Sequence, residues 1–212
     1  MKLLENASRS LISGDAVEVN NLIRKSIKEE LPVKQILDEG LISGMKVVGE
    51  KFKNQEIFLP EVLMAARAMY AGLELLQPLL IGENIPSLGK VVLGTVQGDM
   101  HDLGKNLVGI MLKGAGFEVI DIGKDVAPEK FIEVAVENGA DVIGMSALLS
   151  TTQQSMIPVI ELLRAKGLQS KIKTIVGGPP ITEEWAQDIG ADAYASDATE
   201  SVDRIKELLG IS

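Results

Sequence analysis

The spacing of hydrophobic positions changes near the middle of the chain. From residue 16 to about residue 80, aliphatic side chains recur every three or four positions, which is the period of one face of an α-helix. This pattern predicts three helices: one capped by Asp15, one with Pro32 in its first turn, and one opened by Pro60. A shorter helix is expected before Ser13. Short connections between these helices predict a four-helix bundle over residues 1–80.

From residue 90 onward, short apolar runs alternate with helical patterns. The apolar runs predict strands at 91–96, 118–122, 142–146, 174–176 and 193–195. The segments between and after them predict helices at 105–115, 128–138, 153–166, 182–188 and 200–209. Five successive βα units predict an α/β domain, 90–212, with a five-stranded parallel, doubly wound, Rossmann- or flavodoxin-like sheet. Residues 81–89 are the predicted linker.

The composition narrows the classes of protein and of site. The chain of 212 residues is 46% hydrophobic and carries a net charge of -9 without a basic stripe, which argues against nucleic acid as a partner. The absence of cysteine excludes disulfides, thiolate nucleophiles, iron–sulfur clusters and zinc-thiolate sites. No apolar run has membrane-spanning length, and the first residues lack a signal-peptide core. We therefore expect a cytoplasmic protein with no membrane partner.

The candidate chemistry centres on the single histidine, His101, in the segment Asp99–Gly104. This segment follows the first predicted strand of the α/β domain, and open α/β sheets bind ligands at the carboxyl ends of their strands. Asp99 lies two residues before the imidazole. A carboxylate so placed fixes the tautomer of a metal-binding histidine and raises its basicity. Serine- and glycine-bearing loops at Ser146 and at Gly177–Gly178 follow two other strands and should reach the same edge.

Together, the three loops resemble a known motif. The segment Asp99-x-His101-x-x-Gly104 is followed after 41 residues by Ser146-x-Leu148 and, after 28 more, by Gly177-Gly178. This pattern is similar to the cobalamin-binding motif of methionine synthase and the corrinoid proteins. The preceding bundle is also similar to that class, and Phe52 with residues 58–62 resembles the segment that caps the upper face of the corrin ring. The resemblance covers nearly the whole chain.

The resemblance implies a role for each matching residue. His101 would be the metal ligand that binds cobalt from below and displaces the cofactor's own base, and Asp99 would bond its other ring nitrogen. These two form the implied catalytic pair, and Thr152 stands where relatives have a serine hydroxyl. The other implied cofactor-binding residues of the α/β domain are Gly98, Met100, Asp102, Gly104, Ser146, Leu148, Ser150, Gly177, Gly178 and Ala198. Those of the bundle are Glu39, Phe52, Leu59 and Val62.

The implied function is that of a methyl carrier in anaerobic one-carbon metabolism. Its cofactor would be methylcobalamin or a related corrinoid whose cobalt cycles between Co(I) and methyl-Co(III). The implied partners are a substrate:corrinoid methyltransferase, a corrinoid:acceptor methyltransferase using tetrahydrofolate or a thiol coenzyme, and a reductive activator. The chain alone is expected to be non-catalytic, because it lacks a barrel, a zinc site and a second catalytic group.

Other interpretations stay open at this point. A cobalamin-dependent sensor or regulator uses a similar bundle, although no basic recognition helix is visible here. The small subunit of a cobalamin-dependent mutase has the same sheet domain without this bundle. His101 and Asp99 could also have purely structural roles, and the glycine pair could form only a turn. Asp121 and Asp125 are interpreted as solvated charges, and a side chain at position 178 is expected to overlap the nucleotide tail of the cofactor.

Overall fold

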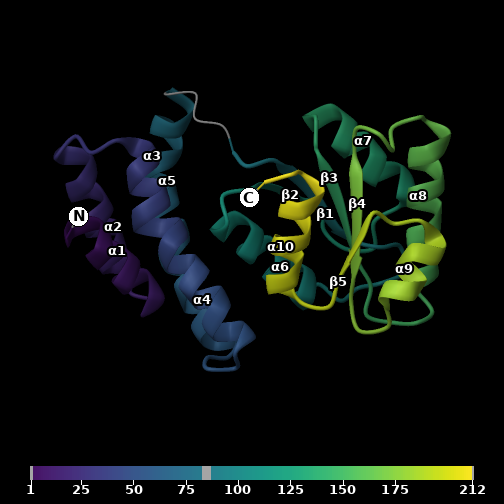
Figure 1. Ribbon diagram of the computed structural model, residues 1–212, viewed down its shortest axis with the longest axis horizontal. Coiled ribbons are helices and arrows are strands. Elements are labelled where there is room, and N and C mark those ends of the chain that lie inside the picture. Colours follow the sequence, from purple (N-terminus) through teal and green to yellow (C-terminus); the bar gives the residue numbers. More distant parts are fainter. Residues whose placement is uncertain (1, 83–86, 212) are drawn as a thin grey trace. The chain divides into compact units, whose positions relative to one another are not determined.

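The structure is a computed structural model that describes residues 2–82 and 87–211, which form a helical unit and an α/β unit (Figure 1). The predicted fold class is confirmed, because a bundle of helices is followed by five parallel strands alternating with helices. Residues 83–86 of the predicted linker lie outside the described residues, so the division into 1–80, 81–89 and 90–212 stays a prediction. Over the described ranges, no helix is both long enough and apolar enough to cross a membrane.

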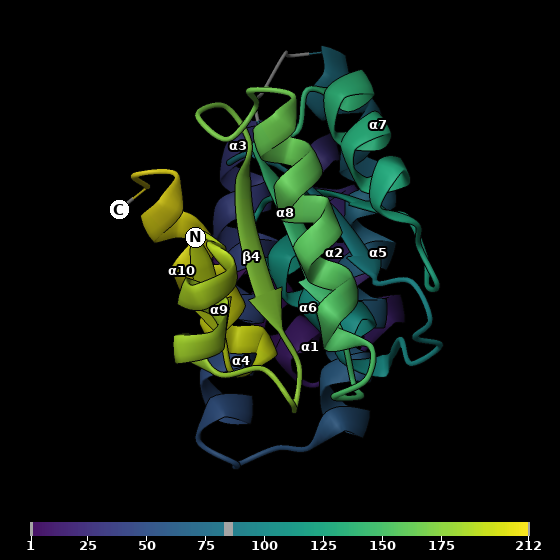
Figure 2. The same ribbon diagram turned by 90° about the vertical axis from the view of Figure 1, so that its right-hand side faces the viewer.

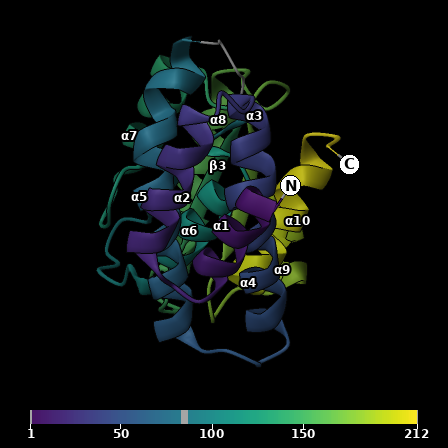
Figure 3. The same ribbon diagram turned by 90° about the vertical axis from the view of Figure 1, so that its left-hand side faces the viewer.

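Two helices of the helical unit begin at side-chain caps. Its elements are α1 (Lys2–Ile12), α2 (Ala16–Lys28), α3 (Val33–Gln35), a π-helical segment η1 (Ile36–Ile42), α4 (Ser43–Lys53) and α5 (Leu59–Gly82). The Asp15 carboxylate accepts the Glu18 N–H at 2.9 Å at the start of α2, as predicted. Glu61 accepts the Phe58 N–H at 3.1 Å and so caps α5. Figure 3 shows α1, α2 and α5 packed side by side.

The helix predicted after Pro32 contains a π-helical segment that the pattern did not indicate. Residues 36–42 widen the turn between α3 and α4, and this segment holds Glu39. The Ser43 hydroxyl donates to the Glu39 carbonyl at 2.5 Å and compensates for the altered hydrogen-bond ladder. Hydrophobic spacing does not distinguish the two helix types over seven residues, because a single widened turn shifts the apolar positions by only about one residue. Such segments are frequent at functional sites.

The α/β unit follows the predicted order of elements. Its strands are β1 (Lys90–Thr95), β2 (Glu118–Asp121), β3 (Val142–Ser146), β4 (Lys173–Gly177) and β5 (Ala193–Ala195). Its helices are α6 (Leu103–Gly114), α7 (Pro128–Asn138), η2 (Gln153–Ser155), α8 (Met156–Ala165), α9 (Glu183–Ile189) and α10 (Ala198–Leu208). Helices α6 and α10 lie on one face of the sheet and α7, α8 and α9 on the other (Figure 1), with α7 beside α8 in Figure 2.

The sheet order places three predicted loops at one edge. The strands run in parallel in the order β2-β1-β3-β4-β5, so the connection after β1 and the connection after β3 lead in opposite directions along the sheet. Such a switch point leaves a crevice at the carboxyl ends of the two central strands, where ligands bind. In the register of the sheet, Ser146 at the end of β3 stands between Thr95 of β1 and Gly177 of β4. The candidate residues therefore share one row of the sheet.

Candidate functional site

The loop after β1 begins with a tight turn that directs Asp99 inward. The Asp99 N–H donates to the Val96 carbonyl at 3.1 Å, and Gly98 in the third position of this turn has φ +86°. Positive φ at that position is what a type II turn requires, and glycine adopts it without steric cost. The turn leaves the Asp99 side chain fully buried, although a carboxylate rarely occupies such a position without partners.

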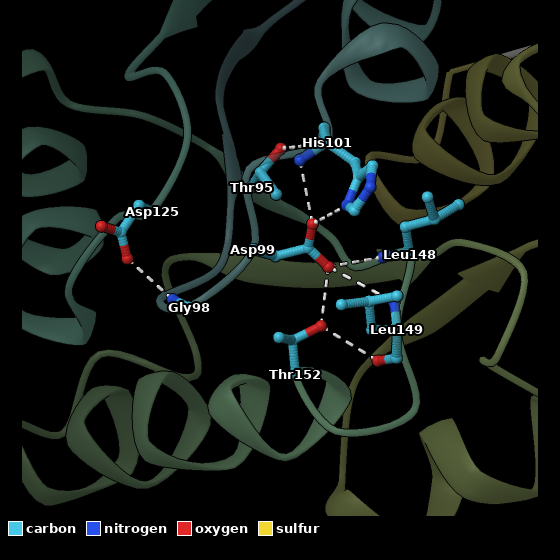
Figure 4. Close-up of polar contacts among 8 residues, drawn as sticks. All are labelled: Thr95, Gly98, Asp99, His101, Asp125, Leu148, Leu149 and Thr152. Atoms are coloured by element: carbon cyan, nitrogen blue, oxygen red, sulfur yellow. Dashed lines mark hydrogen bonds and ion pairs between the residues drawn. The ribbon is translucent and has the colours of Figure 1, made fainter.

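One oxygen of Asp99 holds His101. Asp99 Oδ1 accepts the His101 backbone N–H at 3.0 Å and lies 2.8 Å from Nδ1 of the imidazole (Figure 4). Because a carboxylate accepts, Nδ1 carries the proton, and the lone pair is left on Nε2. The buried hydroxyl of Thr95 donates to the His101 carbonyl at 3.0 Å. The peptide and the ring of His101 are therefore both fixed.

The second oxygen of Asp99 is held by the loop after β3. Asp99 Oδ2 accepts the Thr152 hydroxyl at 2.6 Å and the Leu148 N–H at 2.7 Å. Burial alone would raise the pKa of the Asp99 carboxyl, but bonds from Thr152, from the backbone of His101 and Leu148 and from the His101 ring lower this pKa well below its usual range. The structure thus brings together Asp99, His101, Leu148 and Thr152, with Asp99 ionised.

The surroundings of His101 fit the lower face of a corrin ring. The His101 side chain is 51% exposed, and within the α/β unit no described residue bonds to Nε2. Met100 and Leu148 on the same two loops, and Leu103 at the start of α6, are large apolar side chains that face solvent. A half-exposed imidazole with its metal-binding nitrogen unpaired, among apolar side chains, suits a flat apolar macrocycle with a central metal ion. These residues would hold the group.

Two glycines of the site are favoured over larger residues for different physical reasons. A Cβ added at Gly104, in the first turn of α6, would meet no atom within 4 Å, so this position is open to a ligand. A Cβ at Gly178 would lie 1.9 Å from the Ala147 carbonyl oxygen, and Gly178 has φ +128°. A side chain at 178 would thus displace the neighbouring loop of the protein itself. A substitution at Gly178 therefore cannot test whether the nucleotide tail of the cofactor occupies the predicted slot. A substitution at Gly104 can test whether a ligand lies against the start of α6.

The remaining predicted residues of the α/β unit lie on the same loops or strand ends. Ser146 and Gly177 end β3 and β4, while Ala198 is buried at the first position of α10. Ser150 is exposed on the loop that holds Asp99, and Asp102 directly precedes α6. Gly98 occupies the third position of the turn already described. Their contacts with a cofactor stay predictions.

The four predicted residues of the helical unit differ in exposure. Val62 is fully buried in the bundle core, while Leu59 at the start of α5 is exposed and Phe52 in α4 is partly exposed. Phe58, within the segment compared with the corrin cap, is the most exposed of this group at 66%. Glu39 is exposed on η1 and accepts a bond from Gln35 at 3.1 Å. Their role towards a cofactor stays a prediction.

The interpretation of Asp121 and Asp125 as merely solvated charges is wrong. Asp121 forms an ion pair with Lys105, whose side chain is almost fully buried in α6. Asp125 accepts the Gly98 N–H at 2.7 Å, within the turn that places Asp99. Thr95 was likewise not recognised, although a threonine at the end of an apolar strand is a signal for a polar contact at the sheet edge. Only the fold brings these partners together.

Two domain families match the two parts of the chain. Residues 89–205 match a B12 binding domain family, and residues 3–77 match a second family that is also described as a B12 binding domain. Together, the two matches include all of the predicted site residues. The expected resemblance to cobalamin-binding corrinoid proteins is thereby confirmed.

Individual relatives agree with these matches. The chain is 47% identical over 207 residues to dimethylamine corrinoid protein 3 of Methanosarcina acetivorans. The aligned region covers 98% of this chain and 97% of that protein. It is similar to the crystal structure of the methanol:cobalamin methyltransferase complex from Methanosarcina barkeri, with a TM-score of 0.88 and 26% identity. The match covers 100% of this chain and 81% of the chain in that structure. A cobalamin-binding protein from Desulfitobacterium hafniense gives a TM-score of 0.78, 28% identity and coverage of 97% and 98%.

Proposed function

We propose, from the premise that this chain belongs to the B12 binding domain family, that it carries a methyl group on the cobalt of its corrinoid between two methyltransferases. The cofactor is cobalamin or a related corrinoid. When bound, it supplies a cobalt atom that takes up and releases a methyl group while cycling between Co(I) and methyl-Co(III). One partner methyltransferase would load the group from a small donor, a second would pass it to tetrahydrofolate or a thiol coenzyme, and a reductive activator would restore Co(I).

The observation that carries the proposal is the arrangement of His101. Its Nδ1 bonds to buried Asp99, no described residue of the α/β unit bonds to its Nε2, and exposed apolar side chains stand at nearby positions in the sequence and on the loop after β3. We infer that His101 Nε2 would bind the cobalt. The Thr152–Asp99–His101 chain can then adjust the donor strength of the ring as charge on the metal changes.

We propose a contact role for the other residues on the same edge. Met100, Leu148 and Gly104 would lie against the ring or the start of the nucleotide tail, with Gly98 and Asp102 beside them. Ser146, Ser150, Gly177, Gly178 and Ala198 would line the slot for the displaced base. In the helical unit, Glu39, Phe52 and Leu59 would form the cap of the upper face, buried Val62 would support it from the bundle core, and exposed Phe58 supports an apolar cap in this segment.

For the donor, we propose a methylated amine. The relative with 47% identity is called a dimethylamine corrinoid protein, whereas the structure of the methanol system is 26% identical. The corrinoid-loaded protein should therefore accept methyl groups from a dimethylamine methyltransferase faster than from a methanol methyltransferase. The opposite preference would overturn the choice of donor and leave the carrier role intact.

The ligand assignment is tested on protein labelled with nitrogen-15 in its only histidine. After loading with cobalamin and reduction to Co(II), electron paramagnetic resonance should show two-line splitting from one coordinated nitrogen-15, since the cofactor's own base contains nitrogen-14. His101→Ala should still bind some cobalamin but lose this splitting. Gln97→Ala, in the same loop but exposed, is the control and should keep it. Three-line splitting in the labelled wild type would show that the cofactor's base remains on cobalt and would contradict the proposal.

A further inference from the structure

The β2–α7 loop, residues 122–127, is bonded to the turn that precedes His101. The Gly98 N–H donates to Asp125 Oδ1 at 2.7 Å, and the Asp125 N–H donates to the Asp99 carbonyl at 3.0 Å. Asp125 therefore contacts two consecutive residues from a position 27 residues away in the sequence. In Figure 4, Asp125 lies on one side of Asp99, while Leu148 and Thr152 lie on the other.

The backbone of Asp125 is in an unusual conformation. Its φ is +53°, in the left-handed region that non-glycine residues rarely adopt, although aspartate tolerates it better than most. Its partner Gly98 also has positive φ, at +86°. A strained residue persists where the surrounding contacts determine it, and such residues cluster at functional sites. Here the strained aspartate supplies an acceptor for the Gly98 N–H, which the turn itself does not pair.

The rest of this loop is tied to β1. The Thr95 N–H donates to the Gly123 carbonyl at 2.9 Å, and the Val126 N–H donates to the Thr95 carbonyl at 3.1 Å. Val96 and Val126 form an isolated parallel bridge. These bonds fix Asp125 relative to the central strand. The two bonds from Asp125 then transmit that position to the Asp99 backbone.

We propose that Asp125 is a positioning residue for the cobalt ligand, an inference that rests on the proposed role of His101. Asp125 holds the Asp99 backbone, while Leu148 and Thr152 hold one oxygen of the Asp99 carboxylate. With both sides held, Asp99 Oδ1 is directed at His101 Nδ1, and Nε2 faces outward before a corrinoid arrives. Such preorganisation lowers the entropy cost of binding.

A purely structural role for Asp125 makes a different prediction. If Asp125 had only a structural role, its substitution would change the free energy of unfolding but leave the tautomer of the His101 ring unchanged. The discriminating quantity is therefore the tautomer and order of the His101 ring in the protein without cofactor. Because His101 is the only histidine, its ring signals need no assignment.

The test compares three variants with the wild type. Asp125→Gly removes the carboxylate and permits the left-handed conformation, while Lys124→Gly adds the same glycine freedom at the preceding exposed residue. Asp125→Asn keeps an acceptor oxygen and the tolerance of positive φ, so it should keep the wild-type tautomer of the His101 ring. Long-range nitrogen–proton spectra recorded at alkaline pH should show two widely separated ring nitrogens in the wild type, Lys124→Gly and Asp125→Asn. In Asp125→Gly the two shifts should converge towards a mixture of tautomers.

The same variants are then loaded with cobalamin. Asp125→Gly should raise the dissociation constant about tenfold, the effect of losing one bond to a charged group, and lower the fraction of Co(II) that shows histidine-nitrogen splitting. Ring spectra and splitting in Asp125→Gly that match those of Lys124→Gly would overturn the proposal. If instead wild-type His101 proves not to bind cobalt while Asp125→Gly still mixes the tautomers, the proposed function fails and the positioning of the ring by Asp125 stands.

A measurement on the wild type covers the case in which Asp125→Gly does not fold. The Gly98 amide hydrogen, although on an exposed loop, should exchange with solvent at least about tenfold more slowly than an unbonded amide. In Asp125→Asn this protection should persist. Unprotected exchange at Gly98 in the wild type would remove the contact on which the proposal depends.

Discussion

Two loops of this protein are proposed to contact one cofactor, and they are held in different ways. The loop around His101 is bonded to distant parts of the chain: Asp99 reaches Thr152, and Gly98 reaches Asp125. In the segment 54–58 between α4 and α5, the described bonds are local, such as those from Gln55 to the Phe52 carbonyl and from Phe58 to Glu61. The comparison indicates that tertiary structure sets the geometry of the ligand loop, whereas the bonds described for residues 54–58 come from neighbours in the sequence.

The largest expected effect comes from removing the carboxylate at the centre of the ligand loop. Asp99→Ala should lower the free energy of unfolding by about 3 kcal/mol, because several buried donors lose their acceptor at once. Glu56→Ala, which removes an exposed carboxylate from the α4–α5 segment, is the matched control and should change it by less than about 0.5 kcal/mol. Urea unfolding of both variants measures the difference. Equal losses would contradict the contrast between the loops.

The ionisation of Asp99 predicts a pH dependence of stability. Its pKa is lower in the folded protein than in the unfolded chain, so its contribution is complete above the unfolded value, near about 4, and is lost as the pH falls towards the folded value. Urea unfolding from about pH 6 to about pH 3 should therefore show a steeper loss in the wild type than in Asp99→Ala. Glu200, whose pKa is lowered by bonds from Ser196, remains in both proteins, so their difference isolates Asp99. Parallel curves would contradict the prediction.

In residues 58–62, we expect Val62 to contribute to stability and Phe58 to contribute to protection of the cofactor. Val62→Ala should cost about 2 kcal/mol, because two buried methyl groups leave the bundle core. Phe58→Ala should cost less than about 0.5 kcal/mol, since this side chain is mostly exposed. In the loaded protein, Phe58→Ala should nevertheless speed oxidation of Co(I) by air, followed by absorption spectroscopy. An unchanged oxidation rate would argue against a cap at Phe58.

The smallest expected effect compares two glycines of one helix. Gly104→Ala should weaken cobalamin binding about tenfold, because the added methyl group enters space that the protein leaves open. Gly109→Ala, whose Cβ would make an ordinary contact with Leu93 at 3.5 Å, should leave binding unchanged. Both substitutions should keep the protein without cofactor at least as stable, since alanine favours helix over glycine. Equal affinities of the two variants would remove Gly104 from the site.

Much of the fold followed from local patterns, and the exceptions have physical causes. Short apolar runs between helical patterns predicted all five strands to within one residue at each end, because parallel strands buried on both faces need continuous apolar sequence. The π-helical segment 36–42 was not predicted, because its apolar spacing is compatible with an α-helix. The motif with Asp99 and His101 was recognisable since its residues are close in sequence. Asp125 was not, because nothing near it in the sequence indicates that Gly98 is its partner.

The sequence by itself determined the order of helices and strands, the single histidine and the aspartate two residues before it. These features depend on spacing within a few residues, and local backbone geometry translates them directly into structure. Only the tertiary structure decided that the second oxygen of Asp99 accepts the Thr152 hydroxyl. It also decided that Asp125 holds the turn from a neighbouring loop. Those bonds join residues far apart in the chain, so they exist only once the parallel strands have aligned their carboxyl ends.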